Sequence, residues 1–252
     1  MTAIIALLTD FGTADGYVGE MKGVLLSSAP GPVIDIAHDL VAHDVDGARL
    51  ALARYWVRFP VGTVHLVVVD PGVGTARAAL AVESEGRFLV GPDNGVLSPA
   101  LLHPDARCVA LPIAAGASPT FHGRDVLAPA AGRLATGTTL DTLGEPHPDP
   151  VVRRTPEAIR RADGAIAGSV ITVDRFGNAV TNLMSHRGVG MVEIAGRQLP
   201  LHRAYADVRP GEPVALIGSS GLVEIAIREG NAARQLSLHR GSDVVLHPER
   251  RA

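Results

Sequence analysis

The chain of 252 residues carries 23 Lys and Arg against 26 Asp and Glu, a formal net charge of −3, and 46% of its residues are hydrophobic. Disordered chains combine low hydrophobicity with high net charge, so this composition excludes disorder, and the slight negative charge argues against a nucleic-acid partner. A single cysteine, Cys108, excludes an internal disulfide framework and any multi-cysteine metal site.

The first part of the chain alternates strand-like and helix-like segments. Apolar runs predict buried strands at Ile4–Thr9, Val33–Ile36 and Val64–Val69, and helical spacing predicts helices over Tyr17–Ser28 and Val45–Phe59. Runs that are apolar on both faces are typical of parallel strands covered by helices. We therefore expect a sheet with helices on both of its faces.

A hairpin and a further helix complete this part. Ala78–Ser84 and Arg87–Val90 are joined by Glu85-Gly86, a plausible hairpin turn, and Val126–Leu134 has helical character. No apolar run approaches the roughly 18 residues of a spanning helix, and the N-terminus lacks the basic segment of a signal peptide. We expect a cytoplasmic protein without a membrane partner.

The texture changes after residue 136. Four prolines between Pro146 and Pro156 indicate a linker, and from Ala167 onward short strands alternate with glycine turns, without a convincing helix. We predict an N-terminal α/β domain (1–150) with a mainly parallel central sheet flanked by helices, a linker (151–164), and a small all-β, barrel-like domain (165–252). The predicted strands of that domain are Ser169–Val173, Met191–Ile194, Val214–Ile217, Leu222–Ile227 and Asp243–Leu246.

Two acids follow predicted strands directly. In open α/β sheets ligands bind beyond the carboxyl ends of the strands, where Asp10 and Asp70 both stand, each close to a glycine. An acid at this place binds a ribose diol, binds a metal, acts as a base or merely caps the next helix. Two such acids on strands that can be neighbours favour a functional site.

Arg77 and His122 are the other candidates in this domain. The segment from Asp70 to Arg77 fails the dinucleotide pattern, because Arg77 stands where the third glycine belongs, but it brings an acid and a guanidinium onto one turn. An exposed ion pair of little value is the alternative for these two residues, and a surface or capping role is the alternative for His122. The histidines show no metal-ligand spacing, so we expect no metal site.

Three polar turns stand out in the second domain. Asp174, Phe176 and Asn178 suit a purine, because the ring stacks while an amide reads a base edge; an ordinary Asx turn is the alternative. The turns 218–221 and 230–233 expose backbone N–H groups able to hold a carboxylate or a base.

Together these motifs resemble the S-adenosylmethionine hydroxide adenosyltransferase family, relatives of fluorinases and chlorinases. They occur in the family's order and cover both predicted domains. The motifs are Thr9–Gly12 with Asp15–Tyr17, Val69–Gly74 with Arg77, Gly91–Gly95, Phe121–Asp125, Asp174–Asn178, Gly218–Gly221 and Gly230–Ala233.

The resemblance implies hydrolysis of S-adenosyl-L-methionine to adenosine and L-methionine, without a cofactor. It implies that Asp70, Arg77 and His122 handle the attacking water, whereas the halogenating relatives carry a tyrosine at the position of Asp70 and lack this triad. A chlorinase-like halogenase and a non-catalytic module that binds adenosine or S-adenosylmethionine are the alternatives.

The resemblance also implies substrate contacts and a homotrimer whose site lies between the N-terminal domain of one subunit and the C-terminal domain of its neighbour. Glu224 faces either the substrate or solvent. The remaining implied contacts are Asp10 to the ribose hydroxyls, Phe11, Asp15, Gly16 and Tyr17 along the substrate, Asp174 to the methionine ammonium, Ser219 and Ser220 near its carboxylate, and Asn178, Asn231 and Ala232 to adenine, with Phe176 close by.

Overall fold

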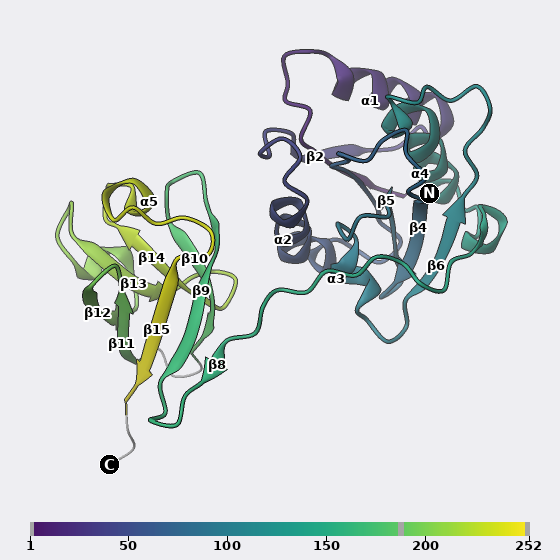
Figure 1. Ribbon diagram of the computed structural model, residues 1–252. Coiled ribbons are helices and arrows are strands. Elements are labelled where there is room, and N and C mark those ends of the chain that lie inside the picture. Colours follow the sequence, from purple (N-terminus) through teal and green to yellow (C-terminus); the bar gives the residue numbers. More distant parts are fainter. Residues whose placement is uncertain (1–2, 186–188, 250–252) are drawn as a thin grey trace. The chain divides into compact units, whose positions relative to one another are not determined.

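The chain divides into two units in the computed structural model, which describes residues 3–185 and 189–249 (Figure 1). The units comprise Met1–Arg154 and Thr155–Ala252. The predicted linker 151–164 includes a short strand, β8 (Ile159–Arg160), that pairs within the second unit. The predicted domain limits themselves stay predictions.

The first unit is built on one seven-stranded sheet with the order β2-β1-β3-β5-β4-β6-β7. The first four strands in that order are parallel to one another. Each of the other three strands pairs antiparallel with the strand before it in the order. Glu85 and Gly86 both have positive φ, as the predicted hairpin turn requires. The strands are β1 (Ile5–Thr9), β2 (Val33–Ala37), β3 (Val64–Val68), β4 (Ala79–Ser84), β5 (Arg87–Pro92), β6 (Arg107–Leu111) and β7 (Glu145–Pro146).

Helices cover both faces because the central strands are apolar on both sides. Successive side chains of a strand point to opposite faces, so Leu7 of β1 packs against α1 and α4, and Leu8 packs against α2. The predicted α/β class of this part is thereby confirmed. Its helices are α1 (Tyr17–Ser28), α2 (Val45–Tyr55), α3 (Ser98–Leu101) and α4 (Ala128–Ala135), with the shorter turns η1 (Trp56–Arg58), η2 (Gly123–Leu127) and η3 (Leu140–Thr142).

One helix differs from its prediction at its start. The predicted helix Val126–Leu134 is preceded by a π-helical turn, η2, in which the N–H of Ala128 donates to the carbonyl oxygen of Gly123, five residues back. Pro129 explains the wide turn, because a proline ring in a regular α-helix collides with the carbonyl group four residues before it, here that of Asp125.

The second unit is a closed barrel. Its strands follow the order β10-β14-β13-β12-β11-β15-β9, and the pairing of β9 with β10 closes the ring. The predicted barrel-like all-β domain is thus confirmed. The strands are β9 (Ile166–Val173), β10 (Ala179–Met184), β11 (Gly190–Ile194), β12 (Arg197–His202), β13 (Pro213–Ile217), β14 (Leu222–Ile227) and β15 (Asp243–Pro248).

Within the second unit, β8, β10, β12 and two short helical turns were not predicted from the sequence. β12 contains Pro200 and begins with Arg197, and such residues weaken a strand pattern. The helical turns are η4 (Tyr205–Asp207) and α5 (Ala232–Gln235), which is too short to show a periodic pattern. Within residues 3–185 and 189–249, no helix combines the length and apolar character needed to cross a membrane.

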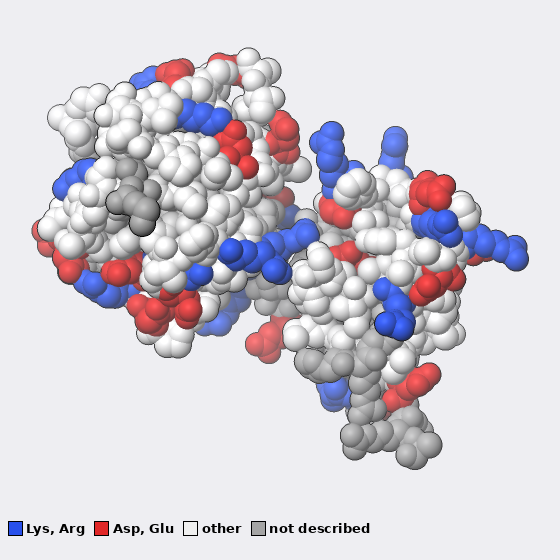
Figure 2. Space-filling view, turned by 180° about the vertical axis from the view of Figure 1, so that it is seen from behind, with Lys and Arg blue, Asp and Glu red and all other residues white. Residues whose placement is uncertain are grey.

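Charges of both signs are interspersed over the face of the molecule that Figure 2 shows. Ion pairs at the surface of the described residues include Arg107 with Glu83 at 3.1 Å. Exposed pairs of this kind contribute little to stability.

Candidate active site

Asp70, Arg77 and His122 form one buried cluster. Arg77 Nε donates to Asp70 Oδ1 at 3.0 Å, and Arg77 Nη2 donates to Oδ2 of the same carboxylate. Arg77 Nη2 also lies 3.2 Å from His122 Nδ1. The side chains of Arg77 and Asp70 are 9% and 6% exposed, and His122 is 4% exposed. An exposed ion pair and a surface histidine, the two alternatives, are therefore wrong.

The guanidinium group determines which nitrogen of His122 carries the proton. Because a guanidinium only donates, Nδ1 accepts from Arg77, and the proton of the neutral ring lies on Nε2. Arg77 Nε and Nη2 also serve Asp70, and Nη1 donates to the carbonyl oxygen of Ala78 at 3.1 Å. His122 keeps its ring N–H at Nε2 as a donor, and the Asp70 carboxylate keeps spare lone pairs.

The backbone brings the three residues together through two close approaches. Asp70 follows β3 in a turn closed by a hydrogen bond from Val73 N to Asp70 O at 3.3 Å. Gly74 has φ of +77°, and a Cβ there would collide with the carbonyl oxygen of Pro119, so only glycine fits. The loop that carries Asp70 therefore lies directly against the segment that leads into His122.

Asp10 lies at the same edge of the sheet as Asp70. β1 and β3 are parallel neighbours, with Thr9 opposite Val68, so the residues that follow them share one edge. The carboxylate of Asp10 accepts a hydrogen bond from His43 N at 2.7 Å, and Asp70 is bonded to Arg77. Neither acid caps a helix, because α1 begins after Gly16 without a side-chain cap and the element that follows Asp70 is strand β4. The capping alternative is wrong for both.

Three aromatic rings surround this edge. The ring centroids of Phe11 and Tyr17 are 6.1 Å apart, and Phe121 lies 5.8 Å from Phe11 and 5.5 Å from Tyr17, all edge to face. Of the three residues, Tyr17 is 46% exposed, so its ring is open to solvent. Asp15 and Gly16 form the exposed turn before α1, where Gly16 has φ of +79°.

An ion-pair network that the sequence did not reveal supports Phe121. The Arg124 guanidinium lies 4.9 Å from the Phe121 ring centroid and donates to Asp125 and to Glu20 of α1, both at 2.7 Å. The hydrogen bonds from Arg124 lower the pKa of Asp125. These bonds link the turn that carries His122 to the helix that begins at Tyr17.

In the second unit, Asp174 organises the turn after β9. Its Oδ1 accepts from the backbone N–H groups of Phe176 and Asn178, both at 2.9 Å, and its Oδ2 accepts from Asn178 Nδ2 at 3.0 Å. This is the Asx turn that was the alternative for this motif. The same turn leaves the Phe176 ring 75% exposed.

A second turn packs against the first. A Cβ on Gly177 would collide with the side chain of Asn231, and Ala233 N donates to Gly177 O at 2.9 Å. Asn231 caps α5 by accepting from Arg234 N at 2.8 Å, and Ala232 is fully buried. The structure thus brings the predicted adenine-binding turns together.

Glu224 is buried, so the solvent-facing alternative is wrong. It lies on β14 against Gly218, next to the exposed Ser219 and Ser220. Burial and the nearby carboxylates of Glu224 and Asp174 raise the pKa of Tyr205, which is hydrogen-bonded to Glu224. No sequence pattern pointed to Tyr205, which begins the short helical turn η4.

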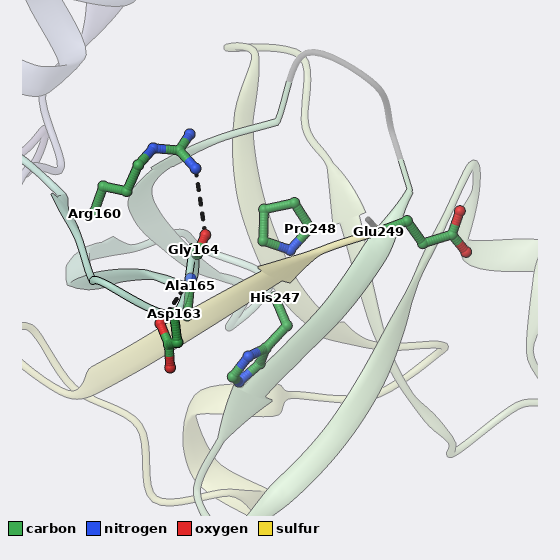
Figure 3. A pocket seen from close by; sticks show the side chains of 7 residues that line it. All are labelled: Arg160, Asp163, Gly164, Ala165, His247, Pro248 and Glu249. Atoms are coloured by element: carbon green, nitrogen blue, oxygen red, sulfur yellow. Dashed lines mark hydrogen bonds between the residues drawn. The ribbon is translucent and has the colours of Figure 1, made fainter. Parts of the chain in front are cut away.

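Two other polar groupings lie away from these residues. Glu85, His103 and Asp105 place ligand atoms within 4.8 Å of one another beside the β4–β5 turn, at the opposite edge of the sheet from Asp70, and they bond to one another. A cavity of about 400 Å³ in the second unit is lined by Arg160, His247 and their neighbours (Figure 3). It lies at the start of β9, whereas Asp174 follows its end.

Comparison with known proteins covers nearly the whole chain. The models for the N-terminal and C-terminal domains of SAM hydroxide adenosyltransferases match residues 5–144 and 168–245. A relative from Thermus thermophilus named (R)-S-adenosyl-L-methionine hydrolase is 43% identical over 255 residues, covering 96% of this chain and 98% of that protein.

Two further comparisons give the range of the similarity. The crystal structure of an uncharacterized conserved protein from Thermotoga maritima superposes with a TM-score of 0.87 at 32% identity, covering 96% of this chain and 99% of that one. A fluorinase from Actinopolyspora mzabensis is 29% identical over 289 residues, covering 96% of each chain.

Proposed function

The chain belongs to the SAM hydroxide adenosyltransferase family, and we propose from this premise that it hydrolyses S-adenosyl-L-methionine to adenosine and L-methionine. The buried Asp70–Arg77–His122 cluster carries this proposal, since it supplies groups that bind and polarise a water. The name of the Thermus thermophilus relative supports it.

The proposed reaction is a substitution at the ribose C5′ atom. A C5′–O bond forms from water, the C5′–S bond breaks, and its electron pair neutralises the sulfonium, so methionine leaves as a thioether. The water gives up one proton, which passes by way of the Asp70 carboxylate to solvent. The leaving group needs no acid. The nucleophile limits the rate, because the pKa of bulk water is far above neutral pH and almost no hydroxide is present.

The cluster matches this demand. In our proposal the water accepts a hydrogen bond from His122 Nε2–H and donates one to the Asp70 carboxylate, which leaves one lone pair of the water for C5′. The positive charge of Arg77 favours the hydroxide form. His122 then orients the water rather than taking its proton, because its Nδ1 lone pair already faces Arg77.

The binding roles are part of the same proposal. Asp10 holds the ribose hydroxyls beside the rings of Phe11 and Tyr17, with Asp15 and Gly16 along the substrate. In the second unit Asp174 holds the methionine ammonium. The other proposed contacts there are Ser219 and Ser220 to the carboxylate, Asn178, Asn231 and Ala232 to adenine, Phe176 as a stacking ring, and Glu224 with Tyr205 beside the substrate.

We also propose a metal-independent, cytoplasmic homotrimer. In this proposal each site lies between the N-terminal domain of one subunit and the C-terminal domain of its neighbour. Light scattering at dilute concentration checks the subunit number, and activity after exhaustive chelation checks the metal independence.

Variants of the cluster test the hydrolysis. We expect Asp70→Asn and His122→Ala to bind S-adenosylmethionine in calorimetry but to form adenosine at least about 100-fold more slowly. His122→Gln keeps an N–H donor near the place of Nε2, so an orienting role predicts that it retains much more activity than His122→Ala. Full turnover by both Asp70→Asn and His122→Ala would contradict the proposal.

Product analysis separates the alternatives. In ¹⁸O-labelled water the label should enter adenosine. A main product of 5′-chloro-5′-deoxyadenosine in the presence of chloride would replace hydrolysis by halogenation, and the absence of any product after prolonged incubation would leave a binding module.

A further inference from the structure

A line of four side chains runs through the first unit to the turn that carries Asp10. Lys22 Nζ of α1 donates to Asp35 Oδ2 of β2 at 2.6 Å, and Asp35 Oδ1 lies 3.0 Å from His38 Nε2. His38 Nδ1 in turn lies 2.9 Å from Thr9 Oγ1, at the end of β1. Lys22 is the only lysine of the chain.

The inner half of this line is buried, so its hydrogen bonds have a fixed direction. Thr9 is fully buried and His38 is 6% exposed. Burial raises the pKa of Asp35, but the hydrogen bonds from Lys22 and His38 more than offset this and lower it, so Asp35 only accepts. The proton of the neutral His38 ring therefore lies on Nε2, and Nδ1 accepts from the Thr9 hydroxyl.

The Thr9 hydroxyl links His38 to the turn after β1. With its proton directed at His38, the oxygen presents its lone pairs to the backbone N–H of Phe11, 3.3 Å away. Gly12 N donates to the carbonyl oxygen of His38 at 2.8 Å. The chain on the far side of Asp10 is thus held twice, once by the side chain of Thr9 and once by the backbone of His38.

The loop after β2 also holds the carboxylate of Asp10 itself. His43 N donates to Asp10 Oδ2 at 2.7 Å, and His43 has φ of +67°, a conformation that residues other than glycine rarely adopt. One oxygen of Asp10 is therefore fixed by residues 38–43, the same loop that His38 anchors to β1 and β2. A carboxylate that binds two neighbouring hydroxyls needs both oxygens aimed at them.

We propose that Thr9 and His38 are positioning residues for the carboxylate of Asp10 and that they set the preference of the site for a ribose over a 2′-deoxyribose. This inference rests on the proposed function, in which Asp10 binds the ribose hydroxyls. In the proposed function neither residue contacts the substrate, because Thr9 is fully buried and His38 is 6% exposed.

Thr9→Val is the decisive variant because it removes the hydroxyl group without changing the shape of a fully buried side chain. Calorimetry on the intact protein measures the affinities for adenosine and for 2′-deoxyadenosine. We expect the wild-type chain to prefer adenosine and Thr9→Val to lose about tenfold of that preference, the equivalent of one net hydrogen bond. Thr9→Ser keeps a hydroxyl group at this position and should therefore keep the preference for adenosine.

The outcomes separate this inference from the proposed function. A Thr9→Val protein that keeps the wild-type preference, or that loses affinity equally for both nucleosides, would overturn it, since an equal loss means that the network only supports the fold. A wild-type chain that binds neither adenosine nor S-adenosylmethionine would overturn the proposed function first. His38→Gln provides a second reading, with a loss of preference expected in the same direction.

Discussion

The Asp70–Arg77–His122 cluster of the first unit and the Asp174–Asn178 turn of the second unit differ in how much of each is buried. In the cluster, two buried charges are paired with each other and with an imidazole, so its geometry is complete without a ligand. In the turn, one carboxylate orders its own backbone while Phe176 stays exposed. The first unit thus holds a polar cluster that is ordered by its own side chains, whereas the second unit holds an ordered turn that leaves an aromatic ring exposed.

Removing one partner of the buried cluster should have the largest effect. Arg77→Ala leaves the Asp70 carboxylate buried without its partner, so we expect the free energy of unfolding to fall by about 3–5 kcal/mol. Trp56, the only tryptophan, lies in the same unit and reports its unfolding by fluorescence. The free energy of unfolding should fall much less in the double variant Asp70→Asn/Arg77→Gln, which leaves no unpaired charge. An equal fall in Arg77→Ala and in the double variant would contradict this account of the cluster.

Acid should destabilise the first unit through His65. Its burial, together with the charge of Arg87, lowers its pKa from 6.5 to about 4. Between these values the unfolded chain binds a proton that the folded chain does not, so stability falls as the pH falls from about 6.5 to 4, by about 3 kcal/mol. Denaturation followed by Trp56 fluorescence at several pH values measures this slope.

His65→Phe should flatten the dependence of stability on pH, because phenylalanine does not titrate. The position accepts its ring, since His65 is surrounded by the rings of Tyr55, Trp56 and Phe59. The matched control is His239→Phe, an exposed histidine of the second unit that should leave the Trp56 transition unchanged. An unaltered slope in His65→Phe would contradict the assignment.

A smaller loss is expected at the turn of the second unit. Asp174→Ala removes the acceptor of two backbone N–H groups and one side-chain amide, and we expect a loss of about 1–2 kcal/mol. Hydrogen exchange of the β9 and β10 amides measures it. Asp174→Asn keeps one acceptor oxygen, so its stability should lie between that of the wild-type chain and that of Asp174→Ala.

The smallest effect on stability sharpens the contrast. Phe176 is 75% exposed, so Phe176→Ala should change the free energy of unfolding by less than about 0.5 kcal/mol. The same change should weaken binding of adenosine by about tenfold, since stacking on an aromatic ring contributes roughly 1–3 kcal/mol. Calorimetry of adenosine binding decides, with Phe88→Leu, which is partly buried in the first unit's core, as the control for general loosening.

The elements that are apolar in long runs were predictable, and those that depend on single contacts were not. Strand β1, which ends at Thr9, follows from its continuous apolar run, and helix α1 follows from its spacing of period 3.6. The place of Asp10 and Asp70 after their strands follows from the topology. The π-helical turn before α4 depends on Pro129, and Tyr205 reaches Glu224 across a loop. No periodic pattern encodes such contacts, because they join residues far apart in the chain or alter a single turn.

The wide helical turn at Gly123 has a consequence for how the chain tolerates changes in length. His122 directly precedes the five residues of this turn, so deletion of one residue from 123–127 would change the register between His122 and α4. Each residue of an α-helix advances the chain by roughly 100° around its axis, so that deletion would swing His122 away from Arg77 while every side chain of the cluster stayed in the sequence. Register along this one turn is therefore as much a part of the site as the identity of its residues.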